Sequence, residues 1–587
     1  MKRKHGRTNV RHPVTAAPPK SETLSRFISK YALPLILLLM LGALALRASD
    51  LRADPPPDLS WSTGPYTDEA LNTYSARNMV LYGHWRMDDF FPLVVYPLVN
   101  YVMLLVFKLF GMGFVQVKLL SLLAGVASVL VIYLLVKEDA GHLAGLLAGL
   151  VLATSFPLTM YSRLGLVESV QILFLLLTGL CYVRGLKRPW QMGLAGLLSA
   201  SSILLVKVSA AFIAPALATA FAWELFAARK DRAAVQVMLR GLGWGFAGIG
   251  VALGIWLAIV FLPHHADYFQ YVLRHSLESP AGHPQGPVAY LLNTFTVGLK
   301  SRLIPRLSWV ALLGFLVLPV LASGRRPALR YLGLWFTLAL LMLGYMNYRP
   351  DRYELVLLPT LIAGFAVSLA RIIETGTLLP RLKPTLPKAG LYTLWLWILA
   401  TQLTYYTNGF WGALRPRNES ALLVATLVVA VAAGVLSYAI AWVAARNGLS
   451  IRSPAARAAI ALALLLLTVR LDLAQYSRWF GTRTHVMVES GADLDRALSA
   501  DAVLAGNWAT ALLVGSKRHA VPLTDWANSD DPVGRFGATH LVSAENGFDF
   551  KLFSQLYPDM MPKASVFRRY EVRGIPLLVY ELPKRGE

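Results

Sequence analysis

The sequence predicts an α-helical protein that crosses a membrane many times and ends in a small α/β domain. Three observations support this fold class. Hydrophobic residues make up 56% of the 587 residues and charged residues only 15%, whereas a soluble globular protein is about 25% charged. The apolar residues form runs long enough to cross roughly 30 Å of hydrocarbon. The net charge of +23 comes from Lys and Arg residues that lie between these runs.

Thirteen apolar runs are candidate membrane spans. They cover residues 31–47, 114–136, 141–161, 167–186, 190–206, 208–228, 240–262, 306–323, 328–346, 354–372, 390–410, 421–445 and 456–473. We therefore divide the chain into a basic cytoplasmic tail (1–30), a transmembrane region (31–473) and a soluble domain (474–587). The basic residues before the first run resemble a signal-peptide n-region. No convincing small-residue cleavage site follows, so the first run is expected to remain as an anchor.

A further apolar stretch, residues 94–110, carries Pro97, Asn100 and Lys108. If this stretch does not cross, the short basic loops between the other runs all face the cytoplasm, as the positive-inside rule requires. If it crosses, all of these loops move outside. We therefore interpret it as juxtamembrane or re-entrant, with thirteen spans in the plasma (inner) membrane, a cytoplasmic N-terminus and an extracytoplasmic C-terminal domain. Two long loops, 48–112 and 263–305, then face the outside together with the tail.

The tail differs in pattern from the rest of the chain. Short strands are predicted at Val503–Ala505, His519–Leu523, His540–Ser543 and Ile575–Glu581, and they alternate with helical or loop stretches such as Asp549–Tyr557. This alternation predicts the small soluble α/β domain.

Cysteine and histidine usage limits the possible metal sites. Cys181 is the only cysteine, so the chain has no intramolecular disulfide and no cysteine-based zinc site. Any metal must use histidine and carboxylate ligands. The external histidines His84, His264, His265, His275 and His283 do not match a zinc template such as HxxH or HExxH.

The first external loop contains adjacent carboxylates, Asp68 and Glu69, directly after Thr67. One interpretation is structural, because Thr67 is a good helix N-cap and two carboxylates in a first turn suit the helix dipole. The other is functional. The loop folds back onto the membrane, and a carboxylate kept at the hydrocarbon border is costly unless it is paired or used.

Five motifs on the outer face together carry a resemblance to a known family. They are Thr67–Ala70 with Gly83–Trp85 downstream, Tyr161–Glu168, Leu204–Lys207, Asp267–His275, and Asp351–Tyr353 before Pro359. In this order they resemble the GT-C superfamily of polyprenyl-phosphate-sugar glycosyltransferases, and specifically its protein O-mannosyltransferase and lipid A aminoarabinose transferase branch. The match covers roughly residues 30–370 and the thirteen-span plan.

The resemblance implies an inverting transfer of a sugar from a polyprenyl monophosphate carrier to an acceptor at the outer face. It implies that Asp68 is the general base, that Glu69 is its neighbour, and that Glu168 is a second acidic residue. Glu168 also reads as a helix cap, and Arg163 also reads as its ion-pair partner. Further residues are implied in phosphate binding or in the cavity. The phosphate candidates are Lys207, Arg349, Arg352 and Arg163, and the cavity candidates are His275, Tyr353 and Tyr96.

Two positions depart from the aminoarabinose transferases. Leu71 stands where those proteins carry a basic residue, and Tyr96 stands where they carry a lysine before the proline of the re-entrant segment. Other cations must then hold the phosphate, and Arg77 is one candidate. Transfer of aminoarabinose is therefore not expected.

The partners follow from the implied reaction. They are the lipid bilayer, a polyprenyl-phosphate-sugar donor, and an acceptor that is a glycan, a lipid or a protein; nucleic acid is not expected. No cofactor is expected to be required, and metal binding through His275 stays open. A transporter or lipid-carrier flippase is the alternative function, but transporters show repeats with polar residues near the membrane centre. Here the ionisable residues lie at the outer rim. A scaffold that displays the C-terminal domain would not need acidic and basic groups at one interface.

Overall fold

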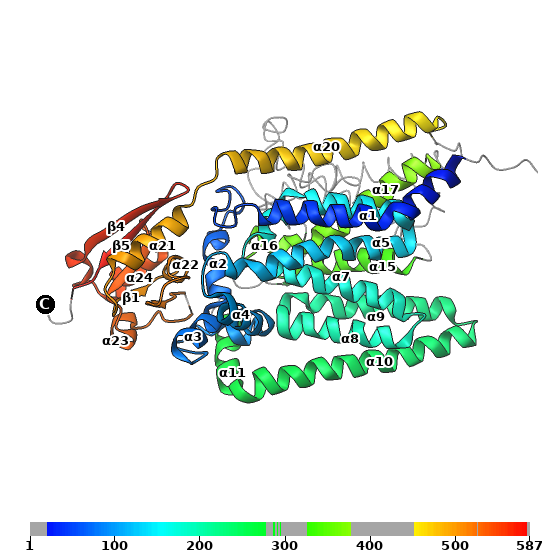
Figure 1. The fold of residues 1–587 in the computed structure, drawn as a ribbon. Helices are drawn as coiled ribbons and strands as arrows, with labels where there is room; N and C mark the ends of the chain where they lie inside the picture. Colours follow the sequence, from blue (N-terminus) through cyan, green and yellow to red (C-terminus); the bar gives the residue numbers. More distant parts are fainter. Residues whose placement is uncertain are drawn as a thin grey trace, which may run out of the picture.

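The computed structural model describes residues 20–277, 326–376 and 451–583 except Asp525, together with positions 286, 287, 290 and 294, and it describes no side chains for residues 20–26 and 272–277. These residues form a long helical bundle with a separate α/β domain at one end (Figure 1). The predicted fold class, a polytopic helical protein with a small C-terminal domain, is confirmed.

Nine segments of the described residues are long and apolar enough to cross a membrane. Their main helices are α1 (Lys20–Ala48), α5 (Leu119–Thr154), α7 (Val167–Gly185), α8 (Pro189–Ser201), α9 (Ile213–Ala228), α10 (Arg232–Trp256), α15 (Pro327–Gly344), α17 (Leu358–Thr375) and α20 (Pro454–Gly481). α5 packs against α1, α7 and α17. Fully buried aromatic residues such as Trp335 and Phe365 fill the centre of the bundle.

Two of the predicted runs form the single segment α5, which bends back on itself at Gly141. Gly141 has φ 81° and ψ 174°, outside the helical region. The Tyr133 hydroxyl is 2.9 Å from Nδ1 of His142. A Cβ atom at Gly145 would lie 2.7 Å from the carbonyl oxygen of Tyr133, so the two halves are antiparallel and tightly packed. The nine segments therefore correspond to ten predicted runs, and the runs 306–323, 390–410 and 421–445 lie outside the described residues.

Four shorter helices lie at the end of the bundle that faces the C-terminal domain: α2 (Gly64–Asn72), α3 (Tyr74–Tyr82), α4 (Pro97–Phe110) and α11 (Leu262–Leu277). α4 has 14 residues, about 21 Å at 1.5 Å per residue, which is shorter than the hydrocarbon layer. Asn100 of α4 accepts a hydrogen bond from the Ala76 amide and donates one to the Asn72 carbonyl. α4 is thereby attached to the α2–α3 corner, and its failure to cross the membrane stays a prediction.

The C-terminal domain has a five-stranded sheet in the order β2-β1-β3-β5-β4. The strands are β1 (Val503–Ala505), β2 (His519–Val521), β3 (His540–Ala544), β4 (Ser565–Val572) and β5 (Ile575–Glu581). β1 pairs in parallel with β2 and β3, whereas β5 is antiparallel to β3 and β4. The helices of this part are α21 (Val486–Ala497), α22 (Ala509–Leu512), α23 (Pro532–Phe536) and α24 (Phe548–Leu556).

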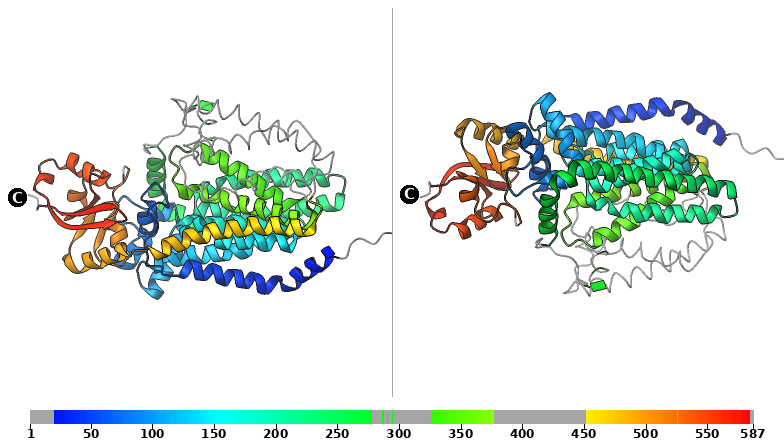
Figure 2. Two further views of the ribbon diagram at one scale, coloured as in Figure 1. Left: turned by 90° about the horizontal axis from the view of Figure 1, so that it is seen from above. Right: turned by 90° about the horizontal axis from the view of Figure 1, so that it is seen from below.

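The boundary between the two parts differs from the expected one. α20 continues past residue 474 to Gly481, and α21 begins at Val486. Residues 482–485 therefore connect the bundle to the domain. Seen from above and from below, residues 48–112 lie between the helical bundle and the C-terminal domain (Figure 2).

Candidate active site

Four charged side chains from distant parts of the sequence meet at the end of the bundle that faces the C-terminal domain. Nη2 of Arg352 is 2.7 Å from Oδ2 of Asp68, and its Nε is 3.7 Å from Oε1 of Glu168. Nζ of Lys207 donates to the same oxygen of Glu168 at 2.7 Å. Lys207 is 6% exposed and Glu168 4%. We call Asp68, Glu168, Lys207 and Arg352 the charged cluster.

The backbone around Lys207 explains how a lysine in an apolar run reaches this cluster. A π-helical turn, η3 (Ser202–Val206), ends at Lys207, which has an extended backbone with φ −163° and ψ 124°. A 3₁₀ turn, η4 (Val208–Phe212), follows. The helix is therefore broken at Lys207, and its ammonium lies 4.0 Å from the centre of the Tyr353 ring. A cation over an aromatic face is stabilised by the ring quadrupole.

Arg352 is positioned by the short helix α16 (Asp351–Glu354) and by the first external loop. The Trp61 amide donates to Oδ2 of Asp351 at 3.0 Å, and the Trp61 indole donates to the Arg349 carbonyl at 3.3 Å. Glycine at position 64 makes room for the pair between Arg352 and Asp68. A Cβ atom there would lie 2.2 Å from Nη1 of Arg352 and 2.6 Å from Oδ2 of Asp68.

The position of Asp68 in its helix corrects one expectation. α2 begins at Gly64, so neither Asp68 nor Glu69 lies in its first turn, and Thr67 is not the N-cap. Thr67 instead donates its hydroxyl to Oδ1 of Asp68 at 3.4 Å. Burial raises the pKa of Asp68, the positive charge of Arg352 opposes this rise, and the negative charge of Glu168 adds to it.

Glu69 points away from the charged cluster. Its Oε2 accepts a hydrogen bond from the Gly165 amide at 3.2 Å, and its Oε1 is 3.8 Å from Nζ of Lys118. Lys118 also donates to the Leu51 carbonyl at 2.8 Å. Burial raises the pKa of Glu69. Glu69 therefore joins α2 to the turn that precedes α7.

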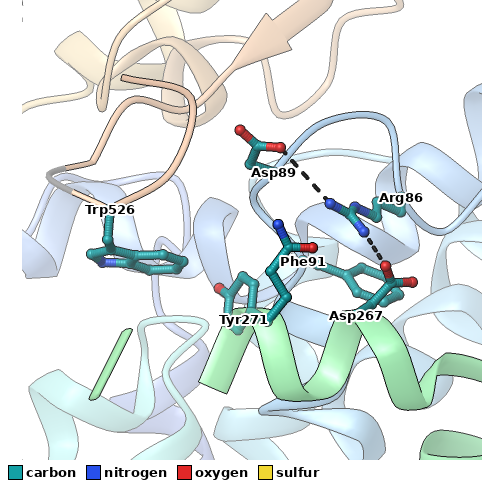
Figure 3. A pocket seen from close by; sticks show the side chains of 7 residues that line it. Arg86, Asp89, Phe91, Asp267, Tyr271 and Trp526 are labelled. Atoms are coloured by element: carbon teal, nitrogen blue, oxygen red, sulfur yellow. Dashed lines mark hydrogen bonds and ion pairs between the residues drawn. The ribbon is translucent and has the colours of Figure 1, made fainter. Parts of the chain in front are cut away.

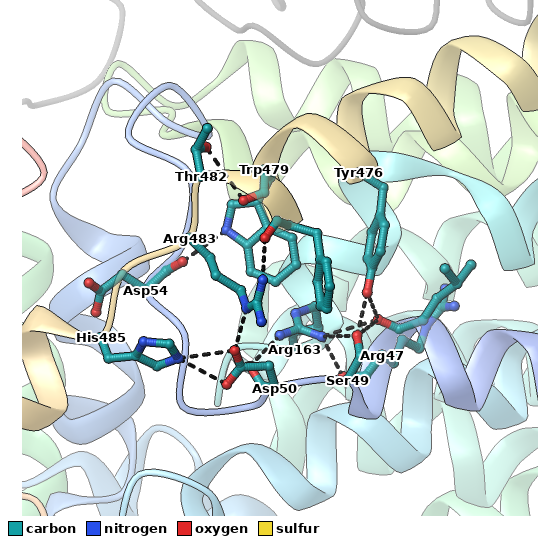
Figure 4. A network of polar contacts seen from close by, with 12 residues as sticks. Arg47, Ser49, Asp50, Asp54, Arg163, Tyr476, Trp479, Thr482, Arg483 and His485 are labelled. Atoms are coloured by element: carbon teal, nitrogen blue, oxygen red, sulfur yellow. Dashed lines mark hydrogen bonds and ion pairs between the residues drawn. The ribbon is translucent and has the colours of Figure 1, made fainter.

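Arg163 is also outside the cluster, and its contacts are with the end of α1. It donates to the carbonyl oxygens of Arg47 and Asp50 at 3.0 and 2.8 Å and lies 4.5 Å from the centre of the Trp479 ring. Figure 4 shows this network, in which Asp50 also binds Arg483 and His485. The pair of Arg163 with Glu168 that the sequence allowed is absent from these contacts, because Glu168 binds Lys207 and Arg352.

The other predicted residues have separate surroundings. Burial lowers the pKa of Arg349, and the nearby Glu354 opposes this. Burial raises the pKa of Tyr96, and the negative charges of Glu168 and Asp68 act in the same direction. Tyr353 lies beneath both cations of the cluster, 5.2 Å from the Arg352 guanidinium. His275 belongs to α11, but its side chain lies outside the described residues.

Arg77, suggested as another phosphate ligand, instead joins the first external loop to the C-terminal domain. Its Nη2 donates to the carbonyls of Ser516 and Arg518 at 2.9 and 2.7 Å.

Within the described part of the chain, no group of three His, Cys, Asp or Glu side chains is placed to hold a metal ion.

Tyr348 lies beside the charged cluster and was not among the predicted site residues. Burial raises the pKa of Tyr348, and its hydroxyl interacts with Arg352. The sequence feature that could have identified Tyr348 is its position directly before Arg349.

Comparisons with known proteins identify the architecture. Residues 94–256 match the family described as dolichyl-phosphate-mannose-protein mannosyltransferase. The structure is similar to that of ArnT from Cupriavidus metallidurans bound to undecaprenyl phosphate, with a TM-score of 0.54 and 15% identity over 94% of this chain and 98% of that chain. The chain has the GT-C fold. The predicted superfamily resemblance is thereby confirmed, and this GT-C chain is a multi-pass membrane protein.

Other GT-C structures are also similar to this chain. ArnT from the same organism in the apo state gives a TM-score of 0.55 and 16% identity over 94% of this chain and 98% of that chain. The Archaeoglobus fulgidus oligosaccharyltransferase tethered with an acceptor peptide gives a TM-score of 0.46 and 12% identity over 88% of this chain and 70% of that chain. No curated protein sequence matches the chain.

Proposed function

We propose that this GT-C chain is an inverting glycosyltransferase that moves a sugar from a polyprenyl monophosphate carrier to an acceptor at the outer face of the membrane. The observation that carries the proposal is the charged cluster, in which a carboxylate lies 2.7 Å from an arginine, with a buried lysine beside them. The family match and the undecaprenyl phosphate in the ArnT structure support this class of donor.

In the proposed reaction Asp68 is the general base. The acceptor oxygen attacks the anomeric carbon, the bond from that carbon to the phosphate oxygen breaks, and its electron pair leaves on the phosphate. The acceptor proton passes to the Asp68 carboxylate. Attack from the face opposite the leaving phosphate inverts the configuration.

Lys207 and Arg352 are the proposed phosphate ligands. The donor phosphate is a diester with one negative charge, and the released monoester carries up to two. Negative charge therefore develops on the phosphate in the transition state, where fixed cations in a poorly solvated site stabilise it most. The two cations contact Glu168 and Asp68 in this structure, and the phosphate would take over some of these contacts.

The sugar is proposed not to be aminoarabinose. Leu71 and Tyr96 occupy the two positions at which the aminoarabinose transferases carry basic residues. A side-by-side assay of the purified protein with polyprenyl-phosphate mannose, glucose, arabinose and aminoarabinose tests this directly. The acceptor in that assay is a detergent extract of cell-envelope material.

The function is tested with Asp68→Asn and the control Asp559→Asn, an exposed carboxylate of the C-terminal domain. We expect Asp68→Asn to slow transfer by about 10² to 10⁴ and to leave binding of undecaprenyl phosphate within about threefold of the unmodified protein, because the base acts on the acceptor. Near-normal transfer by Asp68→Asn, or no binding of undecaprenyl phosphate by the unmodified protein, contradicts the proposal.

A further inference from the structure

A shallow pocket opens on the outer face where the first external loop, α11 and the C-terminal domain meet (Figure 3). Arg86 and Asp89 come from the loop, Asp267 and Tyr271 from α11, and Trp526 from the domain. We propose that this pocket binds a neutral sugar unit of the acceptor. The proposal rests on the proposed function, because it assigns the pocket to the acceptor of that reaction.

The apolar side of the pocket is a tryptophan held at a fixed angle. Trp526 is half-buried, and its ring meets that of Tyr271 edge-on, with centroids 4.7 Å apart and planes at 88°. On another side it packs against Phe90 at 5.7 Å. An aromatic ring that is fixed by neighbours yet partly exposed offers an apolar face to the C–H groups of a sugar ring.

The turn that carries Trp526 is itself tied to the first external loop. Asn528 donates to the Pro522 carbonyl at 2.8 Å and accepts a hydrogen bond from the Asp89 amide at 2.8 Å. Asn528 has φ 60°, a left-handed conformation that asparagine tolerates. The position of Trp526 is therefore set before a ligand binds, which lowers the entropic cost of binding.

The polar side of the pocket consists of charges that are already paired. Arg86 pairs with Asp267 and lies 3.8 Å from Asp89, and Asp89 receives two hydrogen bonds from Arg535 at 2.8 and 2.9 Å. Each charged group of the pocket thus already has a partner of opposite charge, so the pocket leaves no unpaired charge for a phosphate or for a cationic ligand. The Arg86 and Asp267 side chains are 33% and 32% exposed.

These exposed groups match the chemistry of a neutral sugar. A guanidinium, a carboxylate and the exposed Gln270 amide are planar, and each can contact a pair of neighbouring hydroxyls. Hydroxyl groups bring both donors and acceptors, so the ion pairs at the rim stay satisfied when the sugar binds.

The pocket is packed against the segment that leads to Tyr96. Tyr271 and Phe91 of the pocket belong to one buried apolar cluster with Leu93 and Val94, just before Tyr96. Burial raises the pKa of Tyr96, and the negative charge of Asp68 acts in the same direction. Tyr271 is buried, so its ring forms the floor between the pocket and the re-entrant segment. An acceptor glycan with one unit in the pocket can therefore direct a neighbouring unit toward the proposed base.

The experiment measures binding of the full-length protein in detergent to a printed array of defined neutral oligosaccharides, acidic oligosaccharides and Ser/Thr-containing peptides. We expect binding to neutral oligosaccharides that is at least tenfold weaker for Trp526→Ala and severalfold weaker for Asp267→Asn. Phe548→Ala, which removes an aromatic ring that is 41% exposed elsewhere in the same domain, should bind like the unmodified protein. Trp526→Phe should retain part of the binding.

Several outcomes overturn this proposal. They are no binding of neutral oligosaccharides by the unmodified protein, binding of peptides or acidic glycans alone, and equal loss in Trp526→Ala and Phe548→Ala. Should Trp526→Ala lower the unfolding temperature, Asp267→Asn combined with Gln270→Ala removes exposed polar groups and decides the question. Binding of undecaprenyl phosphate, measured on the same samples, reports separately on the proposed function and should be unchanged in every variant.

Discussion

The Asp68 carboxylate is surrounded by charges of both signs, and their balance sets its basicity. Burial raises the pKa of Asp68 and is the largest effect; Arg352 and Lys207 lower it, and Glu168 raises it. A general base must be ionised, and it works best when its pKa lies near the working pH. The cluster therefore makes Asp68 more basic than a solvated aspartate, and the two cations limit this rise.

The pH dependence of transfer tests this balance. Because Asp68 must lose its proton to act, kcat/KM should fall as the pH drops through its pKa, which lies above the ordinary value of about 3.9. Replacing Glu168 by Gln removes a negative neighbour and should move this acidic limb to lower pH. Replacing Arg352 by Gln removes a positive neighbour and should move it to higher pH.

The position of the limb, and not the size of the rate, is the measured quantity in this comparison. Rates of both variants are expected to fall, because both residues belong to the charged cluster. A limb that stays in place in both variants would show that Asp68 is not the titrating base.

Gly64 provides a second test of single residues, because its lack of a side chain leaves room for the pair between Arg352 and Asp68. A Cβ atom at this position would overlap Nη1 of Arg352, the end of a flexible side chain, so the arginine would move and the backbone would not. We expect Gly64→Ala to reduce turnover by about 10²-fold, a loss that a 1 Å displacement of a catalytic group can produce. The unfolding temperature should change little. Gly243→Ala, in a helix position with open space around it, is the control; equal activity of both variants would contradict this role of Gly64.

At the scale of elements, the C-terminal domain is fastened to the loop that carries Asp68. Asp54 accepts hydrogen bonds from the amides of Val486 and Met487 at 2.8 and 3.2 Å and from the Thr484 hydroxyl at 2.6 Å. It thus satisfies the first amides of α21 from a different part of the chain. Arg77 makes a second connection farther along the loop.

Removing the Asp54 carboxylate should loosen this connection. Loss of a helix cap costs about 0.5 to 2 kcal/mol, so we expect Asp54→Ala to lower the unfolding temperature and to speed protease cleavage within residues 482–485. Transfer activity should fall as well, because the loop after Asp54 leads into α2. Asp531→Ala removes a cap of the same kind inside the C-terminal domain, where Asp531 accepts from the Gly534 amide at 2.9 Å. A similar loss of transfer in both variants would contradict a specific link through Asp54.

The sequence predicted most of these elements, and the misses have physical reasons. β1 and β5 have the predicted bounds because each is a short, mostly apolar run next to a glycine, Gly506 or Gly574. β4 was missed because it is an edge strand with Arg568, Arg569 and Glu571 among its exposed residues, and charges on an edge weaken the strand pattern.

In the cluster, Lys207 and Arg352 were recognisable because each is a cation next to apolar sequence. The sequence alone did not show that Glu69 and Arg163 lie outside the charged cluster. Their partners, such as the Gly165 amide and the Asp50 carbonyl, are backbone groups, and a backbone partner leaves no signal in a sequence.

At the scale of the whole molecule, the two ends of the bundle have different chemistry. The charged cluster, the pocket beside Trp526 and the C-terminal domain lie at one end. The connection between α9 and α10, with Arg229 and Lys230, lies at the other (Figure 1). Nearby, Arg184 pairs with Glu138 and Arg330 pairs with Glu224. Excess positive charge at one end is the feature that sets membrane orientation, so this second end is expected to face the cytoplasm.

Single-cysteine labelling tests that orientation and the re-entrant position of residues 94–110. Because Cys181 is the only cysteine, Cys181→Ser gives a cysteine-free background into which Lys108→Cys, Lys230→Cys or Asp559→Cys is introduced. A membrane-impermeant maleimide added to intact cells should label positions 108 and 559, and should label position 230 only after permeabilisation. The reason is that α4, with 14 residues, is too short to cross, so Lys108 stays on the same side of the membrane as the loop before α4. Labelling of position 230 in intact cells, with 108 and 559 protected, would reverse the expected orientation. In the same background, labelling of His84→Cys, an exposed position before α4, together with protection of position 108 would show that α4 crosses the membrane.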